Sequence, residues 1–181
     1  MVDKIISLFE RFGSYDYIGE NVSQLEHALQ CAHIAKTNNH DSSFIIACLL
    51  HDIGHLLGYE TKTETMGHLG VLHHEKLGAD WLREIGMSET VCELVESHIQ
   101  SKRYLLTTQS DYYNRLSDAS KQTFNYQGGQ MSSTEIESFR RDPLFLAKLT
   151  LRFYDDQAKI PNKEVPALET YLSDLQSLII V

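Results

Sequence analysis

The chain has 181 residues, which is enough for one domain built around a single buried core. It carries 16 basic and 25 acidic residues and a formal net charge of −9, which argues against nucleic acid or an anionic membrane as its main partner. No apolar run is long enough to cross a bilayer, and the N-terminus lacks the pattern of a cleaved leader, so we expect a soluble cytoplasmic protein.

The first two predicted helices follow clear start signals. Ser23 with Glu26 three residues later is a capping box, and apolar residues at helical spacing behind it predict a helix to about residue 37. Asp41 is placed to cap a second helix. This helix carries the apolar run FIIACLL into the sequence HDIGH, and Gly58 lies where it should end.

Periodic apolar residues predict a third helix over about 71–85 and a fourth over about 88–102. The segment 104–131 is less regular, and the paired glycines of NYQGGQM mark a loop, so we predict a lid or lip there. Asp142 followed by Pro143 predicts the start of a helix that reaches Asp155 or Asp156.

Two prolines then bound a linker before a final amphipathic helix at 166–181. No repeat, low-complexity tract or alternating strand pattern occurs, so the predicted fold is all-α, with one domain spanning 1–181. Cys31, Cys48 and Cys92 are an odd number of widely spaced cysteines within apolar helical patterns, which favours reduced core thiols over disulfides.

The HDIGH sequence places two titratable residues, His51 and Asp52, at the end of an apolar run. Adjacent helical residues point about 100° apart, so this pair needs partners from other helices to hold a metal. His55, four residues after His51, is expected on the same helix face. A carboxylate such as Asp52 can bridge two ions with its two oxygens. The candidate partners are His27, His74, His98 and Asp155.

The ordered set His27, His51-Asp52 and Asp155 resembles the H…HD…D pattern of the HD-domain superfamily, whose members are mostly metal-dependent phosphohydrolases with all-α folds. The inserted His74 and His98 resemble its two-metal variants. The chain is also similar to the HD-domain phosphonate dioxygenases of the PhnZ type. The similar stretches cover most of residues 15–160 and read YDYIGE, QLEHALQCA, LLHDIGH, HEKLGADWL, SHIQSKRYL, LSDAS and YQGG.

The resemblance implies a compact helical HD-domain fold with a di-metal site at the centre of the bundle. In that family a mixed-valent pair of iron ions uses O2 to cleave the carbon–phosphorus bond of 2-amino-1-hydroxyethylphosphonate, giving glycine and phosphate. Asp52 would bridge the two ions. One ion would be held further by His27, His51 and Asp155, and the other by His74 and His98. Nitrogen and oxygen ligands without thiolate suit iron or manganese, and ligand type alone does not choose between them.

The same resemblance gives roles to two residues before the first of these helices. It implies that Tyr17 occupies an open position on the second iron and leaves when substrate arrives, with Glu20 near the substrate ammonium. A displaceable phenol would keep O2 from reacting before substrate is bound. Tyr17, Glu20 and His55 are therefore the candidate catalytic residues.

A phosphonate dianion in an acidic protein requires concentrated positive charge. By resemblance Lys102 and Arg152 bind the phosphonate, helped by His55, Ser120 and Thr123. Arg152 lies one helical turn before Asp155, so a cation and a ligand face one region. Arg103 should point away from Lys102 as a surface charge. The substrate nitrogen stays open: a methylated ammonium could be sheltered by aromatic faces, for which the candidates are Tyr126, Phe153 and Tyr154.

Two of the candidate ligands have a neighbour in the sequence that could also bind a metal. His74 is preferred over His73 as the ligand because HEKLGADWL is the family-like stretch, and Arg152 with Lys159 favours Asp155 over Asp156. The remaining histidines, His33, His40 and His68, fit no ligand pattern.

The sequence is also compatible with other functions. A phosphohydrolase of a nucleotide or small phosphate ester would use the same ligands and cations but has no need of the YDYIGE segment. A di-iron oxygenase of another alcohol or diol would not need the Lys102 and Arg152 pair. A helical binding module without activity would not be expected to keep so many buried polar groups. The expected partner is a small organophosphonate, and the oligomeric state is open.

Overall fold

The structure, a computed structural model, describes residues 1–17, 19–61 and 63–180. Within these ranges every regular element is a helix, and extended residues form only isolated bridges, so the predicted all-α fold is confirmed. The helices in chain order are α1 (Val2–Phe12), α2 (Gln24–Thr37), α3 (Ser42–Leu50), α4 (Ile53–Gly58), α5 (His74–Glu84), α6 (Glu89–Thr108), α7 (Tyr112–Arg115), α8 (Asp118–Thr123), α9 (Ser133–Arg140), α10 (Phe145–Gln157), η1 (Leu168–Tyr171) and α11 (Leu172–Ser177).

The predicted caps of the first two bundle helices are confirmed. Ser23 Oγ accepts the backbone N–H of Glu26 at 3.2 Å, and Glu26 Oε2 accepts the backbone N–H of Ser23 at 2.6 Å. Asp41 Oδ1 accepts the backbone N–H of Phe44 at 2.9 Å. Each bond satisfies a backbone donor that the helix itself leaves free, so these residues fix where α2 and α3 begin.

The helix predicted from Asp41 to Gly58 is broken at the HD pair. Helix α3 ends at Leu50, α4 begins at Ile53, and Asp52 between them has φ −103° and ψ 12°. The expectation that His51 and His55 share one helix face is therefore wrong. The ring of His51 faces His27, with ring centroids 5.0 Å apart, whereas the ring of His55 stacks on His74 at 3.9 Å.

Other predicted boundaries shift by a few residues. Helix α5 starts at His74 rather than near residue 71, because Val71 pairs with Thr65 in an isolated bridge and His73 has a left-handed conformation with φ 57°. Helix α6 runs six residues beyond the predicted end at Lys102, to Thr108.

The start of α10 and the length of the C-terminal helix differ from the prediction. Asp142 does not cap the first turn of α10, which starts at Phe145; its carboxylate accepts the N–H of Leu144 at 2.8 Å and pairs with Lys148 at 2.5 Å. The C-terminal segment forms only η1 and α11, and Ile179 pairs with Met87 in a bridge. Val181, the end of that predicted helix, lies outside the described residues.

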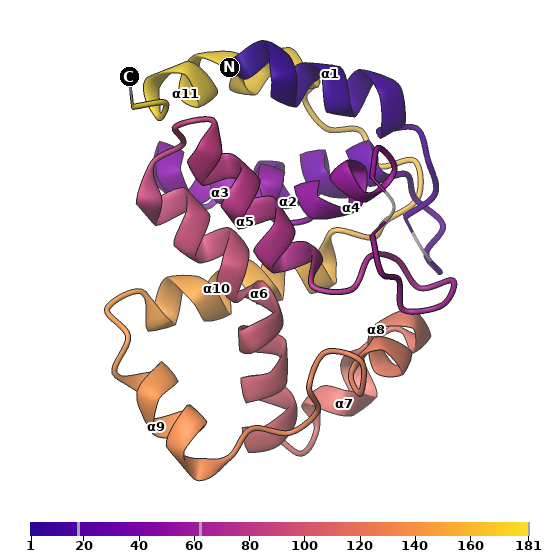
Figure 1. The fold of residues 1–181 in the computed structure, drawn as a ribbon, viewed down its shortest axis with the longest axis vertical. Coiled ribbons are helices and arrows are strands. Elements are labelled where there is room, and N and C mark those ends of the chain that lie inside the picture. Colours follow the sequence, from indigo (N-terminus) through magenta and orange to yellow (C-terminus); the bar gives the residue numbers. More distant parts are fainter. Residues whose placement is uncertain (18, 62, 181) are drawn as a thin grey trace.

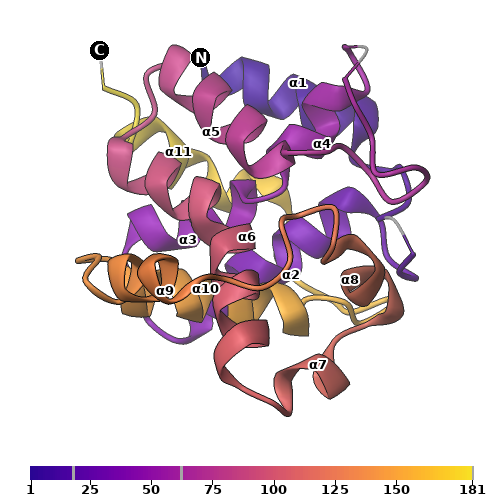
Figure 2. The same ribbon diagram turned by 60° about the horizontal axis from the view of Figure 1, so that its bottom comes forward.

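The helices form two packed parts, with α6 and α10 extending between them (Figure 1). The larger apolar cluster draws on α1 to α6, α10 and α11, and α3 is buried along almost its whole length. The smaller cluster joins the end of α6 to α7, α9 and α10. Both views show α9 on one side of α6 and α7 and α8 together on its other side (Figures 1 and 2).

Three features bear on the general character of the protein. Cys31, Cys48 and Cys92 are buried and unpaired, as predicted. Within the described ranges, no helix combines the length and the apolar character that crossing a bilayer requires. The segment between α6 and α9 contains the short helices α7 and α8 followed by a loop through both glycines of NYQGGQM, in line with the irregular pattern of the sequence.

Candidate di-metal and substrate site

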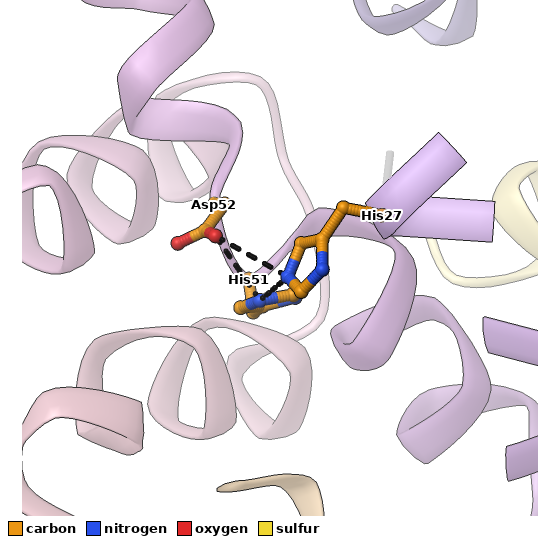
Figure 3. Close-up of side chains that lie close together, drawn as sticks. All are labelled: His27, His51 and Asp52. Carbon is orange, nitrogen blue, oxygen red and sulfur yellow. Dashed lines mark hydrogen bonds and ion pairs between the residues drawn. The ribbon is translucent and has the colours of Figure 1, made fainter. Parts of the chain in front are cut away.

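A first group of potential ligand atoms gathers where α2, the HD pair and α10 meet. His27 Nε2 lies 3.0 Å from His51 Nε2 and 3.6 Å from Asp52 Oδ2, and His51 Nε2 lies 3.2 Å from the same oxygen (Figure 3). Asp155 Oδ1 completes the group at 3.4 Å from His27 Nε2 and 3.8 Å from His51 Nε2. Two imidazole nitrogens and two carboxylate oxygens thus surround one point.

A second group uses the other oxygen of Asp52. His74 Nε2 at the start of α5 and His98 Nε2 on α6 lie 3.0 Å apart. Asp52 Oδ1 is 3.2 Å from His74 Nε2 and 3.4 Å from His98 Nε2. Asp52 therefore presents one oxygen to each group, which is the arrangement expected of a carboxylate that bridges two ions.

The four ring orientations are set by backbone carbonyls. In each ring Nδ1 is hydrogen-bonded to a carbonyl oxygen, at 2.7 to 3.2 Å; the pairs are His27 with Ala158, His51 with Cys48, His74 with Val71, and His98 with Val95. In the neutral form that metal binding requires, the proton of each ring is thus on Nδ1 and the lone pair on Nε2 points into the group. Facing lone pairs at 3.0 Å repel, whereas a bound cation would use both.

Two carboxylate oxygens also indicate that the first group can hold a cation. Asp52 Oδ2 and Asp155 Oδ1 are buried and have no hydrogen-bond partner among the described residues. An unsatisfied buried acceptor costs about 1–3 kcal/mol, and more when it is charged. A cation at the first group would contact both oxygens, so the residues present fit a metal ion.

Both carboxyl groups are held in the ionised form. Burial acts to raise the pKa of Asp52, but its interactions with the surrounding histidines, chiefly His51, outweigh burial and hold that pKa well below its usual value. For Asp155 the opposing pKa effect comes mainly from Arg152, which again prevails over burial. Ionised carboxylates are the state that metal binding requires.

The guanidinium of Arg152 is hydrogen-bonded to Asp155, a candidate metal ligand, and is not free in the cavity. Its Nη1 donates to Asp155 Oδ2 at 2.6 Å, its Nε donates to Tyr112 Oη at 3.0 Å, and its Nη2 donates to Asp156. The hydroxyl of Tyr112 in turn donates to Asp156 Oδ2 at 2.5 Å. Arg152 thereby leaves Asp155 Oδ1 facing the first group, and two of its five N–H donors stay available to the adjacent cavity.

A cavity borders the second group and is lined by most of the predicted substrate residues. Lys102 is 1% exposed and donates to Thr123 Oγ1 and Gln127 Oε1, each at 2.7 Å. Burial, reinforced by the nearby Arg152, lowers the pKa of Lys102 well below its usual value, so an anion in the cavity would find a poorly compensated ammonium. Ser120 and Thr123 border the cavity from α8.

His55 reaches the cavity as a hydrogen-bond donor. Its Nδ1 accepts the backbone N–H of Val71 at 3.1 Å, and burial lowers its pKa well below the usual histidine value. The ring is therefore neutral with its proton on Nε2. Although a His55 nitrogen lies within 4.8 Å of ligand atoms of Asp52 and His74, a protonated Nε2 suits a donor to bound substrate better than a metal ligand.

Tyr17 and Glu20 also line the cavity. The Tyr17 ring stacks on His27 with centroids 3.9 Å apart and an interplanar angle of 15°. Burial, together with the charges of Asp52 and Asp155, raises the pKa of Tyr17 well above its usual value, so the side chain is a neutral phenol. Glu20 Oε1 accepts a hydrogen bond from Lys159 Nζ at 3.0 Å.

The structure also brings in residues that the sequence did not assign to the site. Gln127 and Lys159 are polar members of the lining, and the apolar wall consists of Met66, Leu69, Ile99 and Ala119. Gln127 precedes the two glycines of the predicted loop, so its position in the lid segment was the only available indication. Gln24, the first residue of α2, lines the cavity as well.

The aromatic faces expected for a methylated ammonium lie elsewhere. Tyr126 is 55% exposed, Phe153 packs against the smaller apolar cluster, and Tyr154 accompanies His40 and Phe44. These three rings do not line the described cavity. Among the tyrosine and phenylalanine rings of the described residues, Tyr17 lines the cavity, and its face is already close to the ammonium of Lys159.

The histidines that fit no ligand pattern and Arg103 fall outside both ligand groups. His73 is largely exposed while the adjacent His74 is buried, and His68 lies in a loop, as expected. His40 stacks on Phe44. Arg103 is absent from the cavity lining, as expected, but it is not a free surface charge. Its side chain is only 18% exposed, donates from Nε to the carbonyl of Gly129 at 3.0 Å and pairs with Glu135.

Comparison with known proteins fits this geometry. A helical bundle that brings an H…HD…D set to one point defines an HD-domain protein, and the family model described as HD domain matches residues 25–132. The hydroxymethylphosphonate dioxygenase of Gimesia maris is 37% identical over 179 residues, which cover 98% of this chain and 89% of that protein. The glycine-betaine-forming 1-hydroxy-2-(trimethylamino)ethylphosphonate dioxygenase of Leisingera caerulea is 36% identical over 166 residues, covering 92% and 84%. An uncharacterized protein of Acanthamoeba polyphaga mimivirus is 43% identical over 170 residues, covering 94% and 78%.

These matches extend over nearly the whole chain and over most of each relative. The chain belongs to the HD-domain phosphonate dioxygenases of the PhnZ type, and it is an enzyme of the oxidoreductase class.

Proposed function

We propose that the protein catalyses the O2-dependent cleavage of the carbon–phosphorus bond of a 1-hydroxy-2-aminoethylphosphonate, giving glycine, or an N-methylated analogue, and phosphate. The observation that carries the proposal is one cavity that adjoins the candidate ligands and is lined by side chains of both charges. His55, Lys102 and Arg152 can bind an anion, and Glu20, which is paired with Lys159, can bind a cation. This distribution suits a molecule with a phosphonate dianion at one end and an ammonium at the other.

We propose two iron ions in a mixed-valent state as the cofactor. Asp52 would bridge them, His27, His51 and Asp155 would hold one, and His74 and His98 would hold the other. Nitrogen and oxygen donors without thiolate fit this choice. When bound, the ions would supply the binding and electron transfer that O2 chemistry needs. The fit rests on the facing Nε2 atoms and on the two unpaired carboxylate oxygens.

The overall reaction balances without an outside reductant. The C1–H and C1–P bonds of the substrate are broken, both atoms of O2 enter the products, and one proton is released with glycine and hydrogen phosphate. The task of this chain is therefore to place C1 beside the metal pair, to compensate the phosphonate charge and to keep water out.

The phosphonate end would be bound by donors that the fold already points into the cavity. Lys102 would exchange a neutral partner, Thr123 or Gln127, for an anionic oxygen, which restores its full charge. His55 would donate from Nε2, and Arg152 from the N–H groups that its carboxylate partners leave free. Ser120 and Thr123 add hydroxyl groups from α8.

The nitrogen end would be bound by Glu20, with the face of Tyr17 beside it. Tyr17 would lie at the open side of the second ion before substrate binds and move when substrate arrives. As a neutral phenol stacked on His27, it would cover the first ligand group.

The cytoplasmic location expected from the sequence remains a prediction.

The test is product analysis with three phosphonates supplied to the iron-loaded protein. We expect O2-dependent release of glycine and phosphate from 2-amino-1-hydroxyethylphosphonate, at a higher kcat/KM than for hydroxymethylphosphonate or the trimethylated amine. A preference for either comparison substrate would correct the proposed nitrogen. Hydrolysis of a phosphate ester without O2, and no reaction with any phosphonate, would overturn the proposal.

A further inference from the structure

Glu20, the carboxylate proposed to bind the substrate amine, already has a cationic partner within the chain itself. Lys159 Nζ lies 3.0 Å from Glu20 Oε1 and 5.6 Å from the centre of the Tyr17 ring. Both side chains of this ion pair are only 14% exposed, and all three residues line the cavity. The carboxylate that would recognise a substrate ammonium is therefore engaged.

Lys159 is held in place by its neighbours in the sequence. The carbonyl of Ala158 is hydrogen-bonded to His27 Nδ1 at 2.8 Å. The next residue, Ile160, is bound at both backbone groups by Gln30: its N–H donates to Oε1 at 3.0 Å and its carbonyl accepts from Nε2 at 2.9 Å. Both contacts tie the segment to α2, so the backbone of Lys159 is fixed beside the first ligand group.

The contacts of the Lys159 ammonium are those that a substrate ammonium would need. A carboxylate and an aromatic face are the two groups that recognise such a cation. Two cations cannot share them without like-charge repulsion, which is strong where solvent is largely excluded. A substrate ammonium and Lys159 therefore compete for Glu20.

We propose that Lys159 is a specificity-determining residue that occupies the amine position before substrate binds. A hydroxyphosphonate with a cationic nitrogen has to displace it, whereas one without a nitrogen does not. This inference rests on the proposed function. Glu20 would attract the substrate ammonium and Lys159 would compete with it, so the two residues together set how strongly the enzyme distinguishes amine-bearing from amine-free phosphonates.

Anaerobic calorimetry on the iron-loaded enzyme tests the competition without turnover. The ligands are 2-amino-1-hydroxyethylphosphonate and 1-hydroxypropylphosphonate, which differ by an ammonium in place of a methyl group. In Lys159→Met we expect the affinity for the amine, relative to the methyl ligand, to rise about tenfold over wild type. Lys159→Arg keeps the cation and should keep the wild-type ratio. Lys163→Met, at a lysine outside the described lining, is the matched control.

The possible outcomes separate this inference from the proposed function. Equal weakening of both ligands in Lys159→Met would mean that Lys159 binds the phosphonate, and an unchanged ratio would mean that it does not compete; either result overturns the inference and leaves the proposed function standing. If neither phosphonate binds the wild-type enzyme, both proposals fail.

Discussion

Asp52→Asn is the substitution whose consequences follow most directly from the geometry. Asp52 offers Oδ2 at 3.2 and 3.6 Å from the Nε2 atoms of His51 and His27, and Oδ1 at 3.2 and 3.4 Å from those of His74 and His98. The amide keeps the size of the side chain but removes the anionic oxygen from both groups at once. We expect at least about a 100-fold loss of metal affinity, since loss of an outer partner of a ligand already costs 10–100-fold.

This loss should be visible in thermal stability. A metal ion present at about 1,000 times its dissociation constant stabilises the native state by about 4.1 kcal/mol. For a chain of this length, that corresponds to a rise in Tm of roughly 8–16 °C. If binding is 100-fold weaker, the same concentration is only about 10 times the dissociation constant, and the stabilisation falls to about 1.4 kcal/mol.

The assay is a melting curve of chelator-treated protein with and without added Fe(II) under nitrogen, together with iron content after dialysis. Asp80→Asn, an exposed carboxylate on α5 that pairs with Lys76, is the matched control and should behave as wild type. If Asp52→Asn retains two irons per chain and the full metal-dependent rise in Tm, Asp52 does not bridge the ions.

Three further substitutions test other parts of the site. Tyr112→Phe removes the hydroxyl that bonds both Arg152 and Asp156, so metal affinity measured by chelator competition should fall about tenfold; unchanged affinity would mean that Arg152 holds Asp155 without this support. Lys102→Met should raise the KM for phosphonate about 10- to 100-fold with the metals retained. Burial lowers the pKa of Lys102, so the wild-type enzyme should lose phosphonate affinity as the pH rises, at pH values still below the ordinary lysine pKa. Lys102→Met should not show this loss of affinity. If both proteins show the same pH dependence, a group other than Lys102 causes it. Tyr17→Phe should keep both ions yet consume O2 at a different rate without substrate, and an identical rate would remove Tyr17 from the gating role.

Much of the arrangement could be predicted because it depends on local patterns. The capping box at Ser23 and the cap at Asp41 are chemical signals a few residues long, and the structure confirms both. The order of His27, His51-Asp52 and Asp155 indicated which groups should meet, and the structure brings the two histidines within 4 Å of each other and of both carboxylates. Their role as metal ligands remains a prediction.

The incorrect expectations concern features that depend on tertiary packing. Helical periodicity placed His51 and His55 on one face, but the chain leaves the helix at Asp52 and turns its two oxygens toward different groups. Periodicity cannot show such a break, because no proline marks it and the nearby Gly54 lies inside α4. The pairing of Lys159 with Glu20 joins residues 139 positions apart, and no pattern in the sequence connects them.

We propose that six side chains hold a coupled pair of iron ions to which the phosphonate binds. The decisive experiment is electron paramagnetic resonance of the anaerobic, iron-loaded protein, recorded with metal analysis before and after adding 2-amino-1-hydroxyethylphosphonate. We predict two irons per chain and a mixed-valent signal that shifts when the phosphonate is added. One ion per chain, or a signal that the phosphonate leaves unchanged, would show that the six side chains do not hold such a pair.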